Sequence, residues 1–314
     1  MKTCFIFNPT SGRNLRRPGL SLLVRDFIAA RSLDATFEVT EGRGHATELA
    51  RAAVLAGHGV VVAVGGDGTV NEVAQGIVNT PAALALVPCG SGNGLARHLE
   101  LPRSLSNALE LSSGAGGRVV TIDTGTANGR PFFNAMGLGL DAEVSQRFNG
   151  LTHRGLPAYA RVAVTALREM SAQRCEINAG SRSQTLDVLL VAVANSDQYG
   201  NNARIAPGAR VNDGCLDLVA VKAMSLLRAV TLVPRLFLGN FDQSADVVRL
   251  TGPRFLIRRA AAGLIHTDGE THHTTRDVEV VVQPRSLRVV IPILSRAVAV
   301  ATNVAATRFA LQFP

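Results

Sequence analysis

Three loops rich in glycine and small polar residues are the part of this sequence best suited to binding a charged ligand. Glycine lets a backbone approach a ligand closely and adopt positive φ angles. Successive N–H groups and the start of a following helix then attract an anion such as phosphate. Ser11, Thr69 and Ser91 add hydroxyl donors, and Asp67 could hold a metal ion or accept a proton. Each loop directly follows an apolar run, and the three are Asn8–Gly12, Gly65–Thr69 and Gly90–Gly94.

A single loop of this kind is more often a plain turn, so the argument rests on finding three of them at successive strand ends. None has the P-loop pattern GxxxxGK[ST] or the dinucleotide pattern GxGxxG. The sequence therefore favours an anion site and disfavours a standard P-loop or dinucleotide-binding protein.

The elements that must position these loops alternate between strands and helices. Fully apolar runs of this kind are typical of parallel strands covered on both faces, so we expect a doubly wound, Rossmann-like α/β domain. In such a sheet the loops gather at the carboxyl edge, where ligands bind. The expected strands are Thr3–Phe7, Ala35–Val39, Val60–Val64 and Ala83–Val87. The expected helices are Leu20–Ala30, His45–Ala56, Thr69–Ile77 and Leu95–His98.

Beyond Val119 strands predominate, which predicts an antiparallel sandwich or barrel as a second domain. We expect a nucleotide-binding domain over residues 1–125 and a β-sandwich over 126–294. Residues 295–314 are expected to pack back on the first domain, and Ala297–Ala310 to form a closing helix or strand. Helical patterns appear at Ala158–Met170 and at Leu226–Leu238, which contains Pro234. The expected strands are Val119–Gly125, Phe132–Leu138, Leu186–Ala194, Cys215–Val221, Arg254–Arg259, Val278–Gln283 and Leu287–Pro292.

The amino-acid composition limits the classes of molecule that the chain is expected to bind. A 46% hydrophobic content over 314 residues excludes a largely disordered protein. The net charge of +8 favours anionic partners, but with no Trp and two Tyr the chain is poorly equipped to stack on bases, so we expect no nucleic acid. Four scattered cysteines indicate a cytoplasmic protein with reduced thiols. The longest uncharged run, Val73–Ala96, is broken by glycine and proline, so we expect a soluble chain with peripheral membrane contact at most.

Five stretches together carry a resemblance to a known family. In this order and spacing the chain resembles the diacylglycerol kinase catalytic-domain superfamily, which includes bacterial lipid kinases and sphingosine kinases. The resemblance implies ATP-dependent phosphorylation of a lipid hydroxyl, with the site between a Rossmann-like domain and a β-sandwich. The stretches are FNPTSGR (Phe7–Arg13), VGGDGTVNEV (Val64–Val73), PCGSGNGLARHL (Pro88–Leu99), GNNARIAPGARVNDGCLDL (Gly200–Leu218) and HTDGE (His266–Glu270).

The resemblance also implies roles for individual residues. It makes Asp268 the general base, with Asp67 as the rival, and Glu270 a carboxylate near the nucleotide. A structural Mg²⁺ would be held by Asp213 and by the backbone carbonyls near Leu216 and Leu218, and Asp123 would line the cleft. The residues expected to contact ATP are Asn8, Ser11, Thr40, Gly65, Gly66, Asp67, Gly68, Thr69, Asn71 and Ser91.

Several alternatives remain open. Gly94 stands where many bacterial members carry Asp, and the resulting GSGN-x-LA form is closer to sphingosine kinases, so the acceptor is either diacylglycerol or a sphingoid-type alcohol. An NAD-kinase-like enzyme shares the GGDGT stretch, and a non-catalytic binding module could share the fold. Leu226–Phe241 is either a core helix or a lip at the lipid pocket or membrane. A homodimer is compatible with the sequence.

Overall fold

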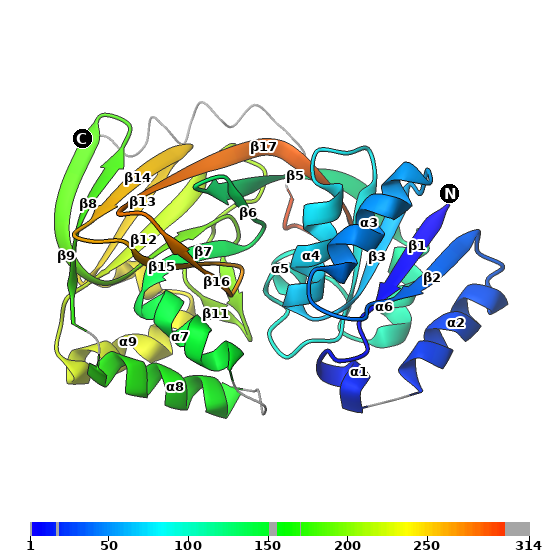
Figure 1. Cartoon of the computed structure of the whole chain (residues 1–314), viewed down its shortest axis with the longest axis horizontal. Coiled ribbons are helices and arrows are strands. Elements are labelled where there is room, and N and C mark those ends of the chain that lie inside the picture. The colour runs from blue at the N-terminus through cyan, green and yellow to red at the C-terminus, as the bar shows by residue number, and fades with distance from the viewer. Residues whose placement is uncertain (1, 17–18, 151–155, 170, 299–314) are drawn as a thin grey trace.

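The structure is a computed structural model that describes residues 2–298, apart from 17–18, 151–155 and 170. Two lobes lie side by side (Figure 1): one has helices around a parallel sheet and the other is built mainly from antiparallel strands. This is the predicted combination of a Rossmann-like domain and a β-sandwich. None of the helices in the described residues combines the length and apolar character needed to span a bilayer.

A parallel sheet in the order β2-β1-β3-β4 forms the centre of the first lobe. Helices α3 and α4 pack on its central strands and α6 packs on β4, so every residue of β3 and β4 is buried. The strands are β1 (Thr3–Phe7), β2 (Ala35–Val39), β3 (Val60–Gly65) and β4 (Ala83–Pro88). The helices are α1 (Gly12–Arg16), α2 (Leu20–Ala30), α3 (His45–Leu55), α4 (Asp67–Ile77), α5 (Gly94–His98) and α6 (Leu105–Ser112).

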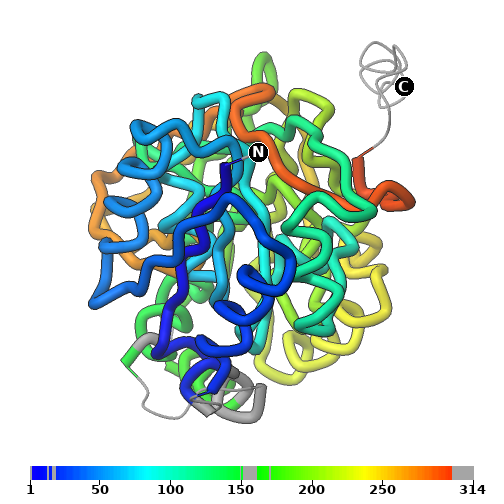
Figure 2. Tube along the Cα trace, turned by 90° about the vertical axis from the view of Figure 1, so that its right-hand side faces the viewer, coloured from blue at the N-terminus to red at the C-terminus, as the bar shows by residue number. Residues whose placement is uncertain are grey.

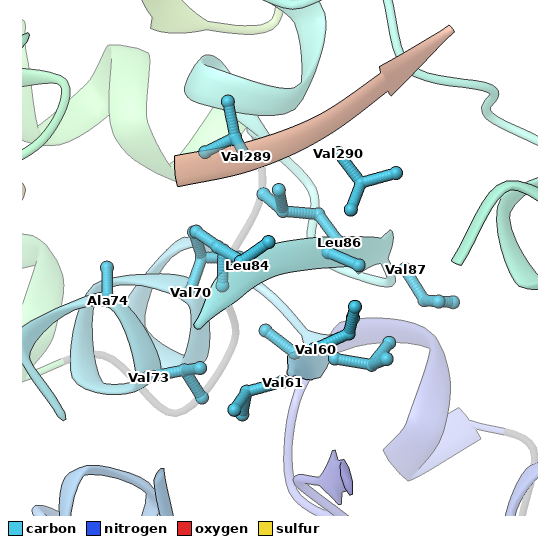
Figure 3. Close-up of a cluster of buried hydrophobic side chains, with 14 of the residues drawn as sticks. Val60, Val61, Val70, Val73, Ala74, Leu84, Leu86, Val87, Val289 and Val290 are labelled. Atoms are coloured by element: carbon cyan, nitrogen blue, oxygen red, sulfur yellow. The ribbon is translucent and has the colours of Figure 1, made fainter. Parts of the chain in front are cut away.

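Branched aliphatic side chains fill the space between α4 and the sheet (Figure 3). In α4 the apolar residues recur at helical spacing, so Val70, Val73, Ala74 and Ile77 share one buried face. Burying one such aliphatic side chain contributes roughly 1.5–3 kcal/mol. This face fixes α4 on the sheet, so the loop before it is held in a constant position.

The second lobe is a set of mostly antiparallel strands in which β9 is central, pairing with β7, β8 and β12. Its strands are β5 (Gly117–Ala127), β6 (Arg130–Phe132), β7 (Ala135–Gly139), β8 (Gln173–Ala179), β9 (Arg182–Ala194), β10 (Gln198–Gly200), β11 (Ala203–Arg204), β12 (Leu216–Lys222), β13 (Val247–Gly252), β14 (Arg254–Arg259), β15 (Gly263–Thr267), β16 (Glu270–Thr274) and β17 (Asp277–Pro292). Its helices are α7 (Leu140–Asn149), α8 (Leu156–Glu169), α9 (Leu226–Leu238) and the short η1 (Phe241–Gln243).

Strand β17 connects the two lobes. Its first half pairs with β14, its second half pairs in parallel with β4, and β5 pairs with it from Val280 to Pro292. The sequence predicted two strands here, Val278–Gln283 and Leu287–Pro292. They form one strand because a bulge between them is filled by Asp123, whose Oδ1 accepts a hydrogen bond of 2.7 Å from the Arg285 N–H.

Two other differences between the expected and the observed elements affect the candidate site. The expected strand Phe132–Leu138 is broken into β6 and β7, because the N–H groups at the break turn toward the carboxylate of Asp268 instead of a neighbouring strand. Helix α4 begins at Asp67, two residues earlier than expected, which places a carboxylate in its first turn where the helix dipole favours it.

The last described residues contact the first lobe. The Ser295 hydroxyl donates to the Leu99 carbonyl at 3.1 Å, and Val298 is buried in the first lobe's core. The expected element at Ala297–Ala310 lies, beyond its first two residues, outside the described part of the chain.

Candidate active site

The three glycine loops meet at the carboxyl edge of the parallel sheet, as expected. The Asn8 side chain in the first loop donates a 2.9 Å hydrogen bond to the Thr69 hydroxyl in the second. The second and third loops approach so closely that a methyl group on Gly90 would lie 2.8 Å from the Gly66 Cα. At Gly12, φ is +34° and a side chain would overlap the Cys89 carbonyl oxygen. Only glycine permits these contacts, so the loops form one surface.

Asn14, a residue that the sequence motifs did not indicate, holds the first loop against the end of β3. Its Nδ2 donates to the Asn8 carbonyl at 2.6 Å and to the Val64 carbonyl at 3.2 Å. The Ser11 hydroxyl lies 3.3 Å from the same Asn8 carbonyl, and the buried Thr40 donates its N–H to Phe7 at 2.9 Å. Asn8, Ser11 and Thr40 therefore gather where β1 and β2 end.

Asp67 ties the second loop to the third. Its two carboxylate oxygens accept the N–H groups of Asn93 and Gly94, both at 2.8 Å, at the start of α5. Burial raises the pKa of Asp67, and these two N–H groups act in the opposite direction. Both oxygens are therefore engaged in holding the loops together, while Ser91 beside them is exposed.

Asp268 lies opposite these loops, at the turn between β15 and β16, and brings the lobes together. Its φ is +50°, a conformation that the turn imposes. Oδ1 accepts the N–H groups of Asn134 and Ala135 at 2.9 Å, and Oδ2 accepts that of Phe133 at 2.7 Å. Oδ2 also accepts a 3.1 Å bond from the Asn71 amide on α4. Burial raises the pKa of Asp268 to about 6, despite these donors.

A buried group of polar side chains holds this turn through the N–H group of Gly269. The Gly269 N–H donates to His266 Nδ1 at 3.2 Å, and His266 Nε2 lies 2.9 Å from Asp141 Oδ2. The Tyr199 hydroxyl donates to the same oxygen at 2.6 Å. Burial alone would lower the pKa of His266, but the Asp141 carboxylate outweighs burial and raises it. The sequence analysis missed Asp141 and Tyr199, because nothing in their spacing points to a histidine more than 60 residues away.

A second contact between the lobes lies beside the first. Glu270, two residues after Asp268, forms an ion pair of 3.3 Å with Arg43, in the segment that precedes α3. The Arg43 side chain is mostly exposed, so the pair contributes at most about 1 kcal/mol. Its position places a carboxylate near the end of β2, where Thr40 also lies.

The residues expected at the magnesium site lie beside the β17 bulge. Asp123 Oδ2 accepts the Gly214 N–H at 2.7 Å, next to Asp213, and burial raises the pKa of Asp123. Leu216 and Leu218 begin strand β12, with both side chains buried. No group of three or more His, Cys, Asp or Glu residues in the described ranges could hold a metal ion. One carboxylate with backbone carbonyls and waters remains a donor set that suits Mg²⁺.

Comparisons with known proteins agree with this architecture. A family model described as the diacylglycerol kinase catalytic domain matches residues 2–127, and one described as the YegS C-terminal NAD kinase beta sandwich-like domain matches residues 134–291. These models define a class of two-domain kinases. The chain belongs to the diacylglycerol kinase catalytic-domain superfamily, and it is a lipid kinase.

Individual relatives cover most of the chain. A diacylglycerol kinase from Bacillus subtilis (strain 168) is 28% identical over 84% of this chain and 88% of its own length. A probable lipid kinase YegS-like protein from Yersinia pestis (strain Pestoides F) is 29% identical over 82% of this chain and 83% of its own. The structure of a putative diacylglycerol kinase from Bacillus anthracis str. Sterne is similar in fold, with a TM-score of 0.76 and 22% identity, over 92% of this chain and 96% of that one.

Replacing Gly137 by Ala tests the support of the Asp-Gly-Glu turn. A methyl group there would overlap the Asp141 carboxylate and lie 2.6 Å from His266 Nε2. We expect the free energy of unfolding to fall by about 1–3 kcal/mol, measured by urea denaturation. Gly42→Ala, where no atom lies within 4 Å of the added methyl, is the matched control. Equal stabilities of the two variants would contradict close packing of Gly137 against Asp141 and His266.

Proposed function

We propose that the protein transfers the γ-phosphoryl group of ATP to the hydroxyl of a lipid, with Asp268 as the general base and Mg²⁺ as the metal ion. The contact between Asp268 and Asn71 carries this proposal, because it sets a carboxylate against the helix that follows the Gly-Gly-Asp-Gly loop. A general base must lie within hydrogen-bond reach of the hydroxyl that it deprotonates. An acceptor bound between Asp268 and the loops meets that condition.

The hydrogen bonds of Asp268 indicate how the acceptor enters. Three of its donors are backbone N–H groups of one lobe, and the fourth is the Asn71 side chain of the other. A carboxylate has about four acceptor sites, so the lipid hydroxyl takes the place of the Asn71 amide at Oδ2. The hydroxyl donates its hydrogen bond there. Its proton passes to Oδ2 as the oxygen bonds to the γ-phosphorus, while the bond from that phosphorus to the β,γ-bridging oxygen breaks and ADP leaves with the electron pair.

Asp67 is the weaker candidate for this base. Its two oxygens accept the N–H groups of Asn93 and Gly94, and no side chain in the described part of the chain donates a hydrogen bond to Asp67 that a substrate could replace. Protonating Asp67 would weaken the contact between the second and third loops. Its position among these loops suits a residue that shapes the phosphate site.

The ATP phosphates bind at the glycine loops, where N–H groups and the α4 N-terminus offer positive dipoles. Phosphoryl transfer depends mainly on positioning and on neutralising charge, which these donors supply. Thr40 and Glu270 contact the nucleotide at the end of β2, and Ser91 lies beside the phosphates. The remaining contacts are assigned to Asn8, Ser11, Gly65, Gly66, Asp67, Gly68, Thr69 and Asn71.

Magnesium would be held by Asp213 together with the backbone carbonyls near Leu216 and Leu218. When bound, Mg²⁺ supplies positive charge and a fixed geometry to the loop that it organises. Asp123 links this loop to the β17 bulge through the Gly214 and Arg285 N–H groups, which supports a role in fixing the joint between the lobes.

The acceptor is diacylglycerol or a sphingoid-type long-chain alcohol. The Bacillus subtilis relative named diacylglycerol kinase supports the first. Gly94, in the GSGN-x-LA form of the third loop, supports the second. We further propose a cytoplasmic protein that contacts the inner face of the membrane, where such acceptors reside, and that can form a homodimer.

Incubation with radiolabelled ATP and Mg²⁺ against diacylglycerol, sphingosine, ceramide, phosphatidylglycerol and NAD tests the function. We expect labelled lipid with the wild type, and a rate lower by roughly 10²- to 10⁴-fold with Asp268→Asn, because the base is lost. Glu270→Gln is the matched control, expected to raise the KM for ATP more than it lowers kcat. Circular dichroism and nucleotide binding report folding. A folded Asp268→Asn variant with wild-type rates would exclude Asp268 as the base, and labelled NAD alone would overturn the lipid assignment.

The pH dependence of the rate follows from the pKa of Asp268. Only the carboxylate can accept a proton, so activity should rise with pH through about 6, the value to which burial raises the pKa. Between pH 7 and pH 5 the ionised fraction, and with it kcat, should fall about tenfold. Initial rates over this range, with circular dichroism at each pH, provide the measurement. A flat profile for the folded enzyme contradicts a base with this pKa.

Asp213→Ala tests the magnesium assignment. Loss of a carboxylate ligand should raise the Mg²⁺ concentration for half-maximal activity by at least about tenfold. Mg²⁺ should also raise the thermal midpoint of the wild type but not that of the variant, since a bound ion stabilises only the folded state. Asp277→Ala, a half-exposed carboxylate on β17, is the control. Identical magnesium responses of wild type and Asp213→Ala would remove Asp213 from the site.

A further inference from the structure

His266 is a buried histidine close to the proposed base, and no step of the proposed reaction uses it. It lies on β15, two residues before Asp268, and only 4% of its surface is exposed. Strand β15 pairs with β7 and with β16, which sets His266 opposite Gly137 on one side and Thr271 on the other. A buried imidazole needs a partner for each ring nitrogen, since an unpaired polar group away from water is costly. The partners of His266 therefore indicate its role.

The part of the second lobe that holds His266 faces the first lobe. Strands β7, β16 and β11 lie on the side of the second lobe nearest α4 and α5 (Figure 1). Seen from the first lobe, the second lobe lies behind it (Figure 2). Side chains in this layer can therefore fix the distance between the Asp-Gly-Glu turn and the glycine loops.

The two ring nitrogens of His266 have partners of opposite kinds. Nδ1 accepts the Gly269 N–H at 3.2 Å, so Nδ1 must carry a lone pair and no proton. Nε2 lies 2.9 Å from Oδ2 of Asp141, and a carboxylate at this distance favours a proton on Nε2. A neutral imidazole protonated on Nε2 suits both contacts, whereas a proton on Nδ1 would set two N–H groups against each other.

Asp141 is itself held in place. It is the second residue of α7, is 6% exposed, and its Oδ2 also accepts the Tyr199 hydroxyl at 2.6 Å. A methyl group on Gly137 would lie 2.1 Å from the same oxygen, so the carboxylate packs directly on the backbone of β7. Packing and hydrogen bonding therefore restrict the Asp141 carboxylate to its position beside the imidazole.

Tyr199 extends these contacts to the third glycine loop. It lies on β10, and the two residues after it pack on Gly92. A methyl group on Gly200 would lie 3.0 Å from the Gly92 Cα, and the Asn201 N–H donates to the Gly92 carbonyl at 3.2 Å. The Asp141 carboxylate therefore contacts two side chains, one that holds the Asp-Gly-Glu turn and one on the strand packed against the third loop.

We propose that His266 is a positioning residue for the base. Asp141 fixes the imidazole with its proton on Nε2, and the Nδ1 lone pair then holds the Asp-Gly-Glu turn so that Asp268 faces the glycine loops. His266 contacts no substrate and acts through the backbone of the turn. A displacement of about 1 Å at a reacting group can lower a rate about 100-fold, so the choice of tautomer affects the rate. The proposal deepens the proposed function and rests on Asp268 as the base.

Replacing His266 by Asn and by Ala separates the hydrogen-bond acceptor from the imidazole. The Oδ1 atom of asparagine can take the place of Nδ1 and accept the Gly269 N–H, whereas alanine has no acceptor. We expect His266→Ala to lower kcat by about 10- to 100-fold and to leave the KM for ATP within about twofold of wild type. His266→Asn should keep kcat within about threefold of wild type.

The matched control is His273→Asn, the same substitution at an exposed position of β16, which should keep the wild-type rate. Circular dichroism of each variant reports folding. Equal kcat values for His266→Ala and His266→Asn overturn the proposal, whether both are high or both are low.

A double-mutant cycle tests whether Asp141 acts through His266. The amide of an asparagine at position 141 can donate to Nε2, which favours a proton on Nδ1, against the Gly269 N–H. Asp141→Asn should therefore lower kcat at least about tenfold in the wild-type background. In the His266→Asn background, where no imidazole remains to be oriented, it should cost less than about threefold. An equal loss in both backgrounds means that Asp141 acts on packing alone, and it overturns the proposal.

The tautomer can be measured without turnover. At about pH 8, nitrogen-15 NMR of the wild type should show the His266 imidazole with a proton on Nε2 and none on Nδ1. The Gly269 amide should exchange about three- to tenfold more slowly than in His266→Ala. A protonated Nδ1, in a neutral or a cationic ring, overturns the proposal. Absence of lipid phosphorylation by a wild type with the expected tautomer contradicts the proposed function, whereas a different tautomer in an active enzyme contradicts only the role of His266.

Discussion

The arrangement of the site depends on the hydrogen bonds that hold one carboxylate. Asp268 accepts the N–H groups of three successive residues, Phe133 to Ala135, and the Asn71 amide of the other lobe. The three backbone donors lie between β6 and β7. Because their N–H groups bond the Asp268 side chain, they do not pair with a neighbouring strand, and the sheet is interrupted there. The carboxylate is nevertheless desolvated enough for its pKa to reach about 6. The hydrogen bonds fix the position of the Asp268 carboxylate, and the raised pKa lets it bind a proton more strongly than an ordinary aspartate does.

The same turn is held at both ends of its hairpin. At the tip, Gly269 donates to His266, which is paired with Asp141. At the open end of the hairpin, the buried Arg259 donates hydrogen bonds to the carbonyls of Leu264 and Thr275, at 3.0 and 2.6 Å. Burial lowers the pKa of Arg259. Arg259 has no carboxylate partner among the residues that the structure describes, so burying its charge is costly, and these carbonyl contacts offset that cost. These contacts make the β15–β16 hairpin rigid, so Asp268 at its tip is held in a fixed position facing the glycine loops.

Local sequence signals predicted the parallel strands of the first lobe and most of its helices, apart from α1 and α6, but only some elements of the second lobe, such as Arg254–Arg259 and Leu226–Leu238. Strands such as Thr3–Phe7 and helix Leu20–Ala30 match the expected bounds, because continuous apolar runs and helical spacing dominate there. Strands β15 and β16 were missed because their polar residues, His272 among them, pair across a hairpin without clear alternation. The loops and the Asp-Gly-Glu turn could be identified from motifs. Their partners, such as Asn14 and Tyr199, could not, since these contacts join residues far apart in sequence.

The continuous strands β5 and β17 limit how the two lobes can move. A sheet that runs from one lobe into the other resists bending except where its ladder is interrupted, and the interruption lies at the bulge that Asp123 fills. Asp123 also holds Gly214, next to Asp213, so the joint and the expected metal loop share one buried carboxylate. Opening of the lobes about this bulge would separate Asn71 from Asp268 and break the hydrogen bond that the lipid hydroxyl replaces in the proposed mechanism. In the proposed mechanism, a hinge at this bulge would couple entry of the acceptor to exposure of the Asp268 carboxylate.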